Sequence, residues 1–381
     1  MNIKLLASFG LFIIIYSSLN YYIGWNLHVW LQTTFQFDNP VVIGIFIAFL
    51  AYAFLFGQIF KALLPLKMVG SFWLACFQFG VIVLPVANVI IYLLHLLGFP
   101  LVSLIISVGF IIWVLFFSYI GFGLYNAYQP VVRTYSLEVP RGKAKRKSLR
   151  IAVASDMHFG GLSGKNHAKR LVRTINKLNA ELVLFPGDLV DDDPSIFKEK
   201  RMDRTLKNIK ADSGVYAVLG NHEYYGGKIK QLTKIMKNIG VTILQDETVV
   251  IDNSIQIVGR KDKTDHKRNT IDELMESSRK STIPTLVLDH QPNDLDAIMD
   301  QGADIVISGH THRGQIAPNH WITKKIFELD WGYKKKNQLH VIVSSGFGFW
   351  GPPIRIGSRS EVVQLDITFI DSLTNSSEKK R

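Results

Sequence analysis

Residues 149–158, LRIAVASDMH, decide how the second half of the chain folds. The apolar run up to Ala154 is typical of a buried strand, and Asp156 and His158, two positions apart at its end, are expected to point to the same side. Apolar runs of the same kind recur at residues 182–185, 215–219, 255–258, 285–288, 305–307 and 341–343. Because helical patterns at 168–178 and 229–239 alternate with them, the sequence predicts an α/β domain.

Residue types that bind metal ions follow almost every one of these apolar runs. The motifs are Asp156-Met-His158, Gly187-Asp188-Leu-Val-Asp191, Gly220-Asn221-His222-Glu223, Asp289-His290 and Gly309-His310-Thr-His312. An α/β fold places its site just outside the carboxyl ends of the strands, so these side chains are expected to meet there. A mixture of carboxylate, imidazole and amide ligands suits Mn, Fe or Zn better than Ca or Mg. Two such ions about 3.5 to 4 Å apart clamp the attacking and leaving oxygens of a phosphoryl transfer.

In the order and spacing of these motifs, the sequence resembles the calcineurin-like metallophosphoesterase superfamily from Leu149 to about Thr368. The resemblance implies an αββα sandwich that hydrolyses phosphoesters with two divalent metal ions. The ligands that it implies are Asp156, His158 and His312 for the first ion, Asn221, His290 and His310 for the second, and Asp188 as the carboxylate that bridges them. Residues 214–225 and 344–355 are most similar to the bacterial membrane-associated branch that includes YkuE-like and YaeI-like phosphoesterases.

The same resemblance implies the residues that move a proton. His222 matches the family's general acid, which protonates the leaving alkoxide, and Asp191 matches the carboxylate that pairs with it and keeps it charged. Asp192 stands where protein serine/threonine phosphatases have arginine, which argues against a phosphoprotein phosphatase, and with Asp193 it suits a solvated turn. Arg313 stands where many relatives have glycine, and it is either a phosphate contact or half of a structural ion pair.

Residues 1–128 have the composition of a transmembrane region. No Asp, Glu, Lys or Arg occurs at residues 39–60 or 68–132. Because a helix of about 20 apolar residues crosses a bilayer, four spans are predicted at about 5–24, 41–63, 71–97 and 101–125. Gly98 and Pro100 mark the turn between the last two spans, and Pro85 is expected to kink the third. The first segment resembles a membrane span more than a cleaved secretory signal, since residues 16–25 offer no small-residue cleavage site.

Lysine and arginine in the short loops predict the orientation in the cell membrane. Lys61 lies at the end of the second span and Lys67 in the loop after it, a basic segment at 129–148 follows the fourth, and the other two loops have no cation. This alternation predicts both termini and the catalytic domain (149–370) in the cytoplasm, with a domain outside the cell as the alternative. The segment 129–148 is expected to be a linker that lies against anionic headgroups, so the net charge of +12 points to a membrane more than to nucleic acid.

Four remaining features carry narrower expectations. The single cysteine, Cys76, excludes an intramolecular disulfide and a cysteine-rich zinc site. The charged stretch 260–280 is expected to be a surface excursion and residues 371–381 a polar tail. Aromatic residues and lysines interleave at 321–336, which favours a membrane interface over the stacking of nucleic-acid bases.

Together these patterns predict a membrane-anchored enzyme that hydrolyses a phosphoester or pyrophosphate of a membrane lipid or a lipid-linked intermediate. One alternative is a tethered phosphodiesterase for nucleotides, cyclic dinucleotides or nucleic acid. Another is a membrane receptor that binds a phosphorylated ligand without turnover, against which His222 and Asp191 count, because a binding protein needs no general acid. The oligomeric state and the exact substrate cannot be read from the sequence.

Overall fold

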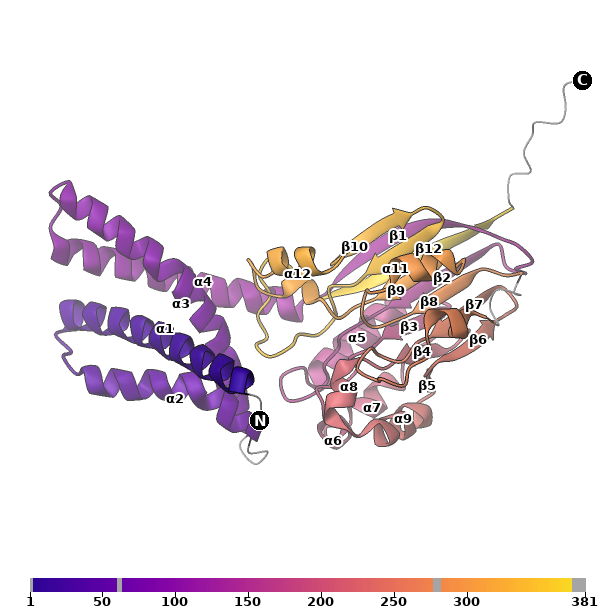
Figure 1. Ribbon diagram of the computed structural model, residues 1–381, viewed down its shortest axis with the longest axis horizontal. Helices are drawn as coiled ribbons and strands as arrows, with labels where there is room; N and C mark the ends of the chain where they lie inside the picture. Colours follow the sequence, from indigo (N-terminus) through magenta and orange to yellow (C-terminus); the bar gives the residue numbers. More distant parts are fainter. Residues whose placement is uncertain (1–2, 60–63, 277–281, 372–381) are drawn as a thin grey trace, which may run out of the picture. The chain divides into compact units, whose positions relative to one another are not determined.

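The computed structural model describes residues 3–59, 64–276 and 282–371 of the chain. The chain divides into two compact units, residues 1–122 and 123–381 (Figure 1). The boundary falls within the fourth helix, which ends at Tyr128, so the last turn of that helix belongs to the second unit.

The first unit consists of apolar helices that are long enough to cross a membrane. They are α1 (Ile3–Phe35), α2 (Pro40–Ile59), α3 (Leu64–Leu96) and α4 (Leu101–Tyr128). The prediction of four such helices is confirmed, and the turn before α4 contains Gly98 at a φ of 92°. The first helix is longer than predicted, because residues 25–35 contain neither proline nor glycine that would end it.

Polar side chains connect the helices of this unit from within. The Tyr16 hydroxyl donates to the carbonyl oxygen of Ala51 over 2.8 Å, and Nε1 of Trp73 donates to Oδ1 of Asn20 over 2.9 Å. Such buried hydrogen bonds tie α1 to α2 and α3. Nδ1 of His95, near the end of α3, lies 3.0 Å from the carbonyl oxygen of Phe99 in the turn that follows the helix.

The second unit is built on two six-stranded sheets. The strand orders are β1-β12-β2-β3-β4-β5 and β10-β11-β9-β8-β7-β6. A shared core, with Ile151 and Leu184 from the first sheet and Ile257 and Ile307 from the second, fills the space between them. The strands are β1 (Val131–Pro140), β2 (Ser148–Val153), β3 (Leu182–Pro186), β4 (Val215–Val218), β5 (Val241–Ile243), β6 (Glu247–Ile251), β7 (Ile255–Gly259), β8 (Thr285–Leu288), β9 (Ile305–Ser308), β10 (Gly332–Lys336), β11 (Leu339–Val343) and β12 (Glu361–Ile370).

Helices cover the outer faces of both sheets. A second core cluster joins the first sheet to α5, α6, α7 and α9, and a third joins the second sheet to α10 and α11. The helices are α5 (Lys165–Lys177), α6 (Pro194–Glu199), α7 (Met202–Leu206), α8 (Asn221–Gly226), α9 (Ile229–Asn238), α10 (Ile271–Met275), α11 (Leu295–Asp300) and α12 (His320–Ile326), with a short 3₁₀ turn, η3 (His312–Gly314), after β9. The predicted αββα sandwich is confirmed (Figure 1).

The segment 129–148 differs from its prediction. It was expected to be a linker, but β1 pairs in parallel with β12 along its whole length, from Val131 beside Glu361 to Pro140 beside Ile370. Its side chains alternate between exposed and less exposed positions, as on an edge strand that buries one face. Such a strand lacks the continuous apolar run that identified the central strands. Because β1 is part of the first sheet, the domain begins earlier than residue 149.

The arginines of this segment, and Arg150 just after it, are paired with carboxylates of the same unit. Ion pairs join Arg133 to Glu361, Arg146 to Glu181 and Asp252, Arg150 to Asp366, and Arg141 to Asp371. Most of these pairs lie at the partly exposed surface of the sandwich, and its own carboxylates largely neutralise the charges of these arginines.

The charged stretch 260–280 is only partly the surface excursion that was predicted. Arg260 is buried, and its Nη1 lies 2.8 Å from Oδ2 of Asp289, which is buried too. The side chain was misplaced because a buried ion pair and a surface charge look the same in sequence. Residues 277–281 and the predicted tail at 372–381 lie outside the described residues.

Candidate metal centre

All seven side chains predicted to bind metal lie at the carboxyl ends of central strands. Asp156 follows β2, Asp188 follows β3 and Asn221 follows β4 in the first sheet, while His290 follows β8 and His310 and His312 follow β9 in the second. His158 is part of the same loop as Asp156. Because both sheets end at the same edge of the sandwich, residues more than a hundred positions apart meet there.

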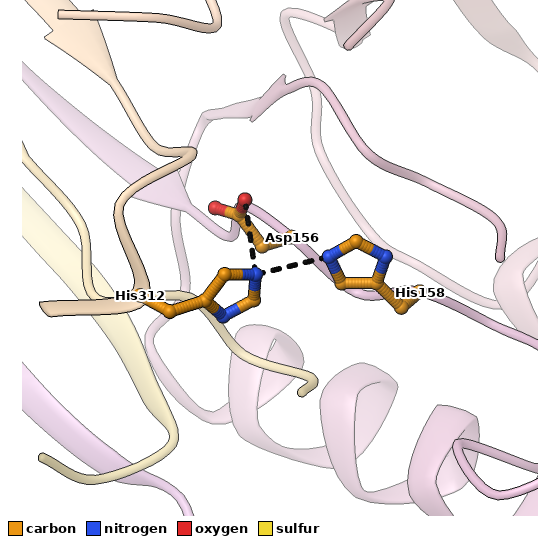
Figure 2. Close-up of side chains that lie close together, drawn as sticks. All are labelled: Asp156, His158 and His312. Atoms are coloured by element: carbon orange, nitrogen blue, oxygen red, sulfur yellow. Dashed lines mark hydrogen bonds and ion pairs between the residues drawn. The ribbon is translucent and has the colours of Figure 1, made fainter. Parts of the chain in front are cut away.

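The first group consists of Asp156, His158 and His312, whose ligand atoms lie within 4.8 Å of one another (Figure 2). Nε2 of His158 lies 3.0 Å from Nε2 of His312, and the latter lies 3.6 Å from Oδ1 of Asp156. Two imidazole nitrogens and a carboxylate that converge in a buried place form a set of electron-pair donors that suits a divalent cation.

The second group consists of Asn221, His290 and His310. Oδ1 of Asn221 lies 3.1 Å from Nε2 of His290 and 2.9 Å from Nδ1 of His310. The two ring nitrogens are 3.3 Å apart. This is the ligand set that the sequence analysis proposed for the second ion.

Asp188 lies between the two groups. Its Oδ2 is 3.2 Å from Nε2 of His290 in the second group and 3.6 Å from Nε2 of His158 in the first. One carboxylate oxygen within reach of both sets has the placement that a bridging ligand needs. The structure thus brings together every residue predicted to hold the two ions, and their role as ligands remains a proposal.

The backbone at these positions is held in a conformation that non-glycine residues rarely adopt. The φ angle is positive at Asp156 (52°), His158 (43°), Asp188 (51°), His310 (71°) and His312 (47°). Each such residue costs about 1 kcal/mol, which the surrounding fold must offset. Strain gathered at five of seven converging side chains indicates a site built for function rather than for stability.

Glycines in the motifs allow the strand ends to approach one another. A side chain at Gly187, where φ is 89°, would place its Cβ 2.4 Å from Nδ1 of His290. At Gly309 a Cβ would lie 2.2 Å from Oδ2 of Asp156. Any larger residue at either position would push a predicted ligand out of place.

Hydrogen bonds around the site orient the predicted ligands. Nδ1 of His290 lies 2.8 Å from the carbonyl oxygen of Pro186, which can only accept, so His290 donates from Nδ1 and turns Nε2 toward the centre. The backbone N–H of His310 donates to both oxygens of Asp156, over 2.9 and 3.1 Å. Glu223 accepts from the backbone N–H groups of Asp188, Val190 and Gly220.

Burial keeps two of the predicted histidine ligands neutral. It lowers the pKa of His158 to about 3, although the charge of Asp188 acts in the opposite direction. Burial, helped by the neighbouring His290, lowers the pKa of His310 to about 4. Neutral imidazole is the form that binds metal, so both rings are ready for a cation near neutral pH.

His222 lies beside the first group, with its ring centroid 4.7 Å from that of His158. Its Nδ1 is 2.7 Å from Oδ1 of Asp192, and its backbone N–H donates to Oδ1 of Asp188 over 3.1 Å. The family resemblance implied that Asp191 makes this pair, and the sequence predicted Asp192 as a solvated turn residue. The structure adds Asp192 to this pair, because it makes the short contact to Nδ1, while the carboxylate of Asp191 also lies within 4.8 Å of ring nitrogens of His222 and His158.

Among the described residues, Arg313 has no partner for the structural ion pair that was its alternative interpretation. Its guanidinium carbon lies 4.0 Å from the ring centroid of Trp331, a cation–π contact, and among the described residues its buried Nε has no hydrogen-bond partner. The side chain is therefore held beside the centre with a donor to spare, which suits the proposed phosphate contact.

Arg355 is the residue near the site that the sequence analysis missed. It is 0% exposed, and Nη2 of its guanidinium lies 3.2 Å from Nδ1 of His312 and donates to the carbonyl oxygens of Gly346 and Gly348. No metal-binding pattern marks an arginine more than forty residues after its partner, so only the fold could reveal the contact.

Comparison with known proteins agrees with this geometry. The family model for calcineurin-like phosphoesterases matches residues 149–314. An uncharacterized metallophosphoesterase of Helicobacter pylori (strain J99) is 34% identical over 68% of this chain and 70% of its own length. One from Aquifex aeolicus is 31% identical over 62% of this chain and 91% of its own length. A "transmembrane protein with metallophosphoesterase domain" from Bos taurus is 31% identical over 64% of this chain and 58% of its own length.

The chain therefore belongs to the calcineurin-like metallophosphoesterase family, and it is a metal-dependent phosphoesterase. The four apolar helices, with relatives named as transmembrane proteins, support association with a membrane. The narrower resemblance to the YkuE-like and YaeI-like branch stays a prediction.

The arrangement suits hydrolysis in which the metal ions and His222 have separate roles. When bound, two divalent ions would supply a hydroxide near neutral pH and neutralise charge on the phosphoryl oxygens. His222 donates its Nδ1 proton to the hydrogen bond with Asp192, which leaves Nε2 to hold the proton for the leaving oxygen. Burial lowers the pKa of His222, but the hydrogen bond to Asp192 and the charges of Asp188, Asp192 and Asp191 outweigh it and raise the pKa to about 9. The ring is thus protonated near neutral pH, as a general acid must be.

Proposed function

We propose that the protein hydrolyses a phosphoester or pyrophosphate bond of a membrane lipid or lipid-linked intermediate, with its catalytic unit at the cytoplasmic surface of the cell membrane. The ions are held by Asp156, His158 and His312, by Asn221, His290 and His310, and by Asp188 between them. His222 is the general acid. The observation that carries the lipid part of the proposal is the exposed apolar helix α12 beside the metal centre.

Helix α12 has the surface of an element that enters a membrane interface. Trp321, Ile322 and Ile326 are 65%, 59% and 67% exposed, and the helix has no buried residue. Lys324 and Lys325 lie in its last turn. Exposed apolar and aromatic side chains flanked by lysines are typical of segments at the level of the headgroups.

This helix is close to the predicted ligands. It follows η3, which begins with His312, and the two elements pack against each other. Directly after it, the Phe327 ring centroid lies 6.0 Å from that of His310. If the apolar side of α12 enters the interface, a phosphate group at the headgroup level comes within reach of the centre.

The end of the membrane helix α4 leads to the same place. Nδ2 of Asn126 donates to the carbonyl oxygen of Arg355 over 3.1 Å, and the N–H of Arg355 donates to the carbonyl oxygen of Gly123. Arg355 in turn contacts His312. Only one side chain separates the last turn of a membrane-spanning helix from a predicted metal ligand, which supports a substrate that resides in the membrane.

The test is phosphate release by the full-length protein, reconstituted in bilayers with Mn, from a panel of lipid phosphates and pyrophosphates beside nucleotides and a water-soluble diester. We expect selective release from one lipid class. The variant I322S/I326S should lose turnover of that lipid and keep turnover of the soluble diester, while V250S, which removes an exposed apolar side chain from β6, should change neither. Activity confined to nucleotides would support the tethered phosphodiesterase instead and overturn the lipid assignment.

A further inference from the structure

A strongly basic surface lies on the outer side of α5, away from the predicted metal ligands. Three adjoining hollows of about 430, 440 and 390 Å³ mark it. We define the α5 basic surface by the six cations that line them: Lys165, Lys169, Arg170, Arg173, Arg201 and Arg204. None of the residues that line these hollows is a predicted metal ligand or His222, so the surface is separate from the catalytic machinery.

These charges are not balanced by neighbours. No carboxylate lines any of the three hollows. Within the described parts of the chain, none of the six cations takes part in an ion pair, in contrast to Arg133, Arg141, Arg146 and Arg150 on the β1 side. Six unpaired cations on one surface repel each other, and an anionic partner relieves that repulsion.

The place of this surface in the fold indicates its partner. Tyr128, the last residue of α4, lines the second hollow, and the following Gln129 lines the third. The guanidinium carbon of Arg170 lies 5.7 Å from the ring centroid of Tyr128. The basic surface therefore begins where a helix with the length and composition of a membrane span ends, at the level where headgroups are found.

The chemistry of the lining favours lipid over nucleic acid. Proteins that bind single-stranded nucleic acid combine cations with aromatic platforms on which bases stack. Besides Tyr128, the hollows contain one further ring, that of His167, which is buried and lies 4.3 Å from the ring of Phe347. The face of Tyr128 is occupied by Arg170. Phosphate groups need only the cations.

We propose that the α5 basic surface binds the anionic headgroups of the bilayer that holds α4. It takes the role that the sequence suggested for segment 129–148, whose arginines are paired within the sandwich. Each cation near an anionic surface strengthens binding by about fivefold, which corresponds to ~1 kcal/mol. The proposal does not depend on which phosphoester the metal centre hydrolyses.

The test measures amide hydrogen exchange of α5 in the full-length protein, reconstituted in nanodiscs of phosphatidylcholine with increasing fractions of phosphatidylglycerol. We expect the exchange of α5 to slow as the anionic fraction rises, and high salt to reverse this. The variant K165E/K169E/R173E reverses the charge at three exposed positions of α5. In this variant, the fraction of phosphatidylglycerol that gives half of the slowing should rise at least about tenfold.

The matched control is K230E/K234E/K237E, which makes the same change of charge at three exposed positions of α9. It should respond to phosphatidylglycerol as the unaltered protein does. Both variants should still hydrolyse a water-soluble diester, which shows that they fold. The proposal would be overturned if exchange of α5 did not change with the fraction of phosphatidylglycerol, or if both variants lost this response equally. Slowing by an added oligonucleotide but not by phosphatidylglycerol would assign the surface to nucleic acid.

Discussion

Nδ1 of His222 lies 2.7 Å from Oδ1 of Asp192, and this pair sets the protonation of the proposed general acid. Without these carboxylates, burial would lower the pKa of His222, because a charged ring is poorly solvated there. The hydrogen bond to Asp192, together with nearby acidic charges, raises the pKa to about 9 instead. Activity is therefore expected to persist to mildly alkaline pH and to fall as the pH rises through the pKa of His222.

The variant D192N should move this alkaline limit to lower pH. The asparagine amide has no negative charge to stabilise the imidazolium, so the pKa of His222 falls and the ring loses its proton at a lower pH. The pH profile of kcat/KM on a water-soluble diester measures the shift. D193N is the matched control, because the Asp193 carboxylate accepts from the N–H of Ser195 and pairs with Lys228. An unchanged alkaline limit in D192N would show that Asp192 does not control His222.

Replacing His222 with asparagine should remove the proton donor and leave the metal ions in place. We expect kcat to fall by about 10²- to 10⁴-fold, the usual contribution of general acid catalysis. Metal content, measured by elemental analysis of the purified protein, should stay near that of the unaltered protein. H266N, at an exposed histidine that matches no motif, is the control and should be fully active. Full activity of H222N would refute the assigned role.

Removal of metal should both inactivate and destabilise the protein. Chelation leaves Asp156 and Asp188 buried without a cation, and binding of an ion at 100 times its dissociation constant returns about 2.7 kcal/mol. Thermal unfolding with and without Mn measures this effect. In D188N the stabilisation by Mn should shrink, because the oxygen that reaches both groups is lost. D300N, an exposed carboxylate on α11, should behave as the unaltered protein.

Loss of Arg355 should weaken the binding of the first ion more than that of the second. The guanidinium holds the ring of His312 in place, and loss of such an outer partner typically costs about 10- to 100-fold in metal affinity. R355K keeps the charge but not the planar fork, so we expect a lower metal content and partial loss of activity. R359K, in the same loop, provides the comparison. Equal metal content in R355K and the unaltered protein would contradict a positioning role.

Much of the fold was accessible from sequence because its signals are local. Central strands such as β3 and β9 are buried on both faces and appear as continuous apolar runs. The four apolar helices are defined by length and composition alone. Edge strands are different: β1 buries only one face and carries Arg133, and nothing within the segment indicates that β12, more than two hundred residues later, will pair with it.

The same division holds for the candidate site. Sequence alone placed Asp156, Asp188 and the histidine motifs at the ends of strands, because ligand types and strand patterns are both written in short stretches. Only the tertiary structure decided that Asp192 makes a short contact to His222, that Arg355 supports His312, and that the unpaired cations lie on α5 and α7 while the arginines near β1 are paired. These contacts depend on which side chains lie within a few ångströms of one another after packing. The sequence around a carboxylate or guanidinium does not indicate which residue it will contact in the fold.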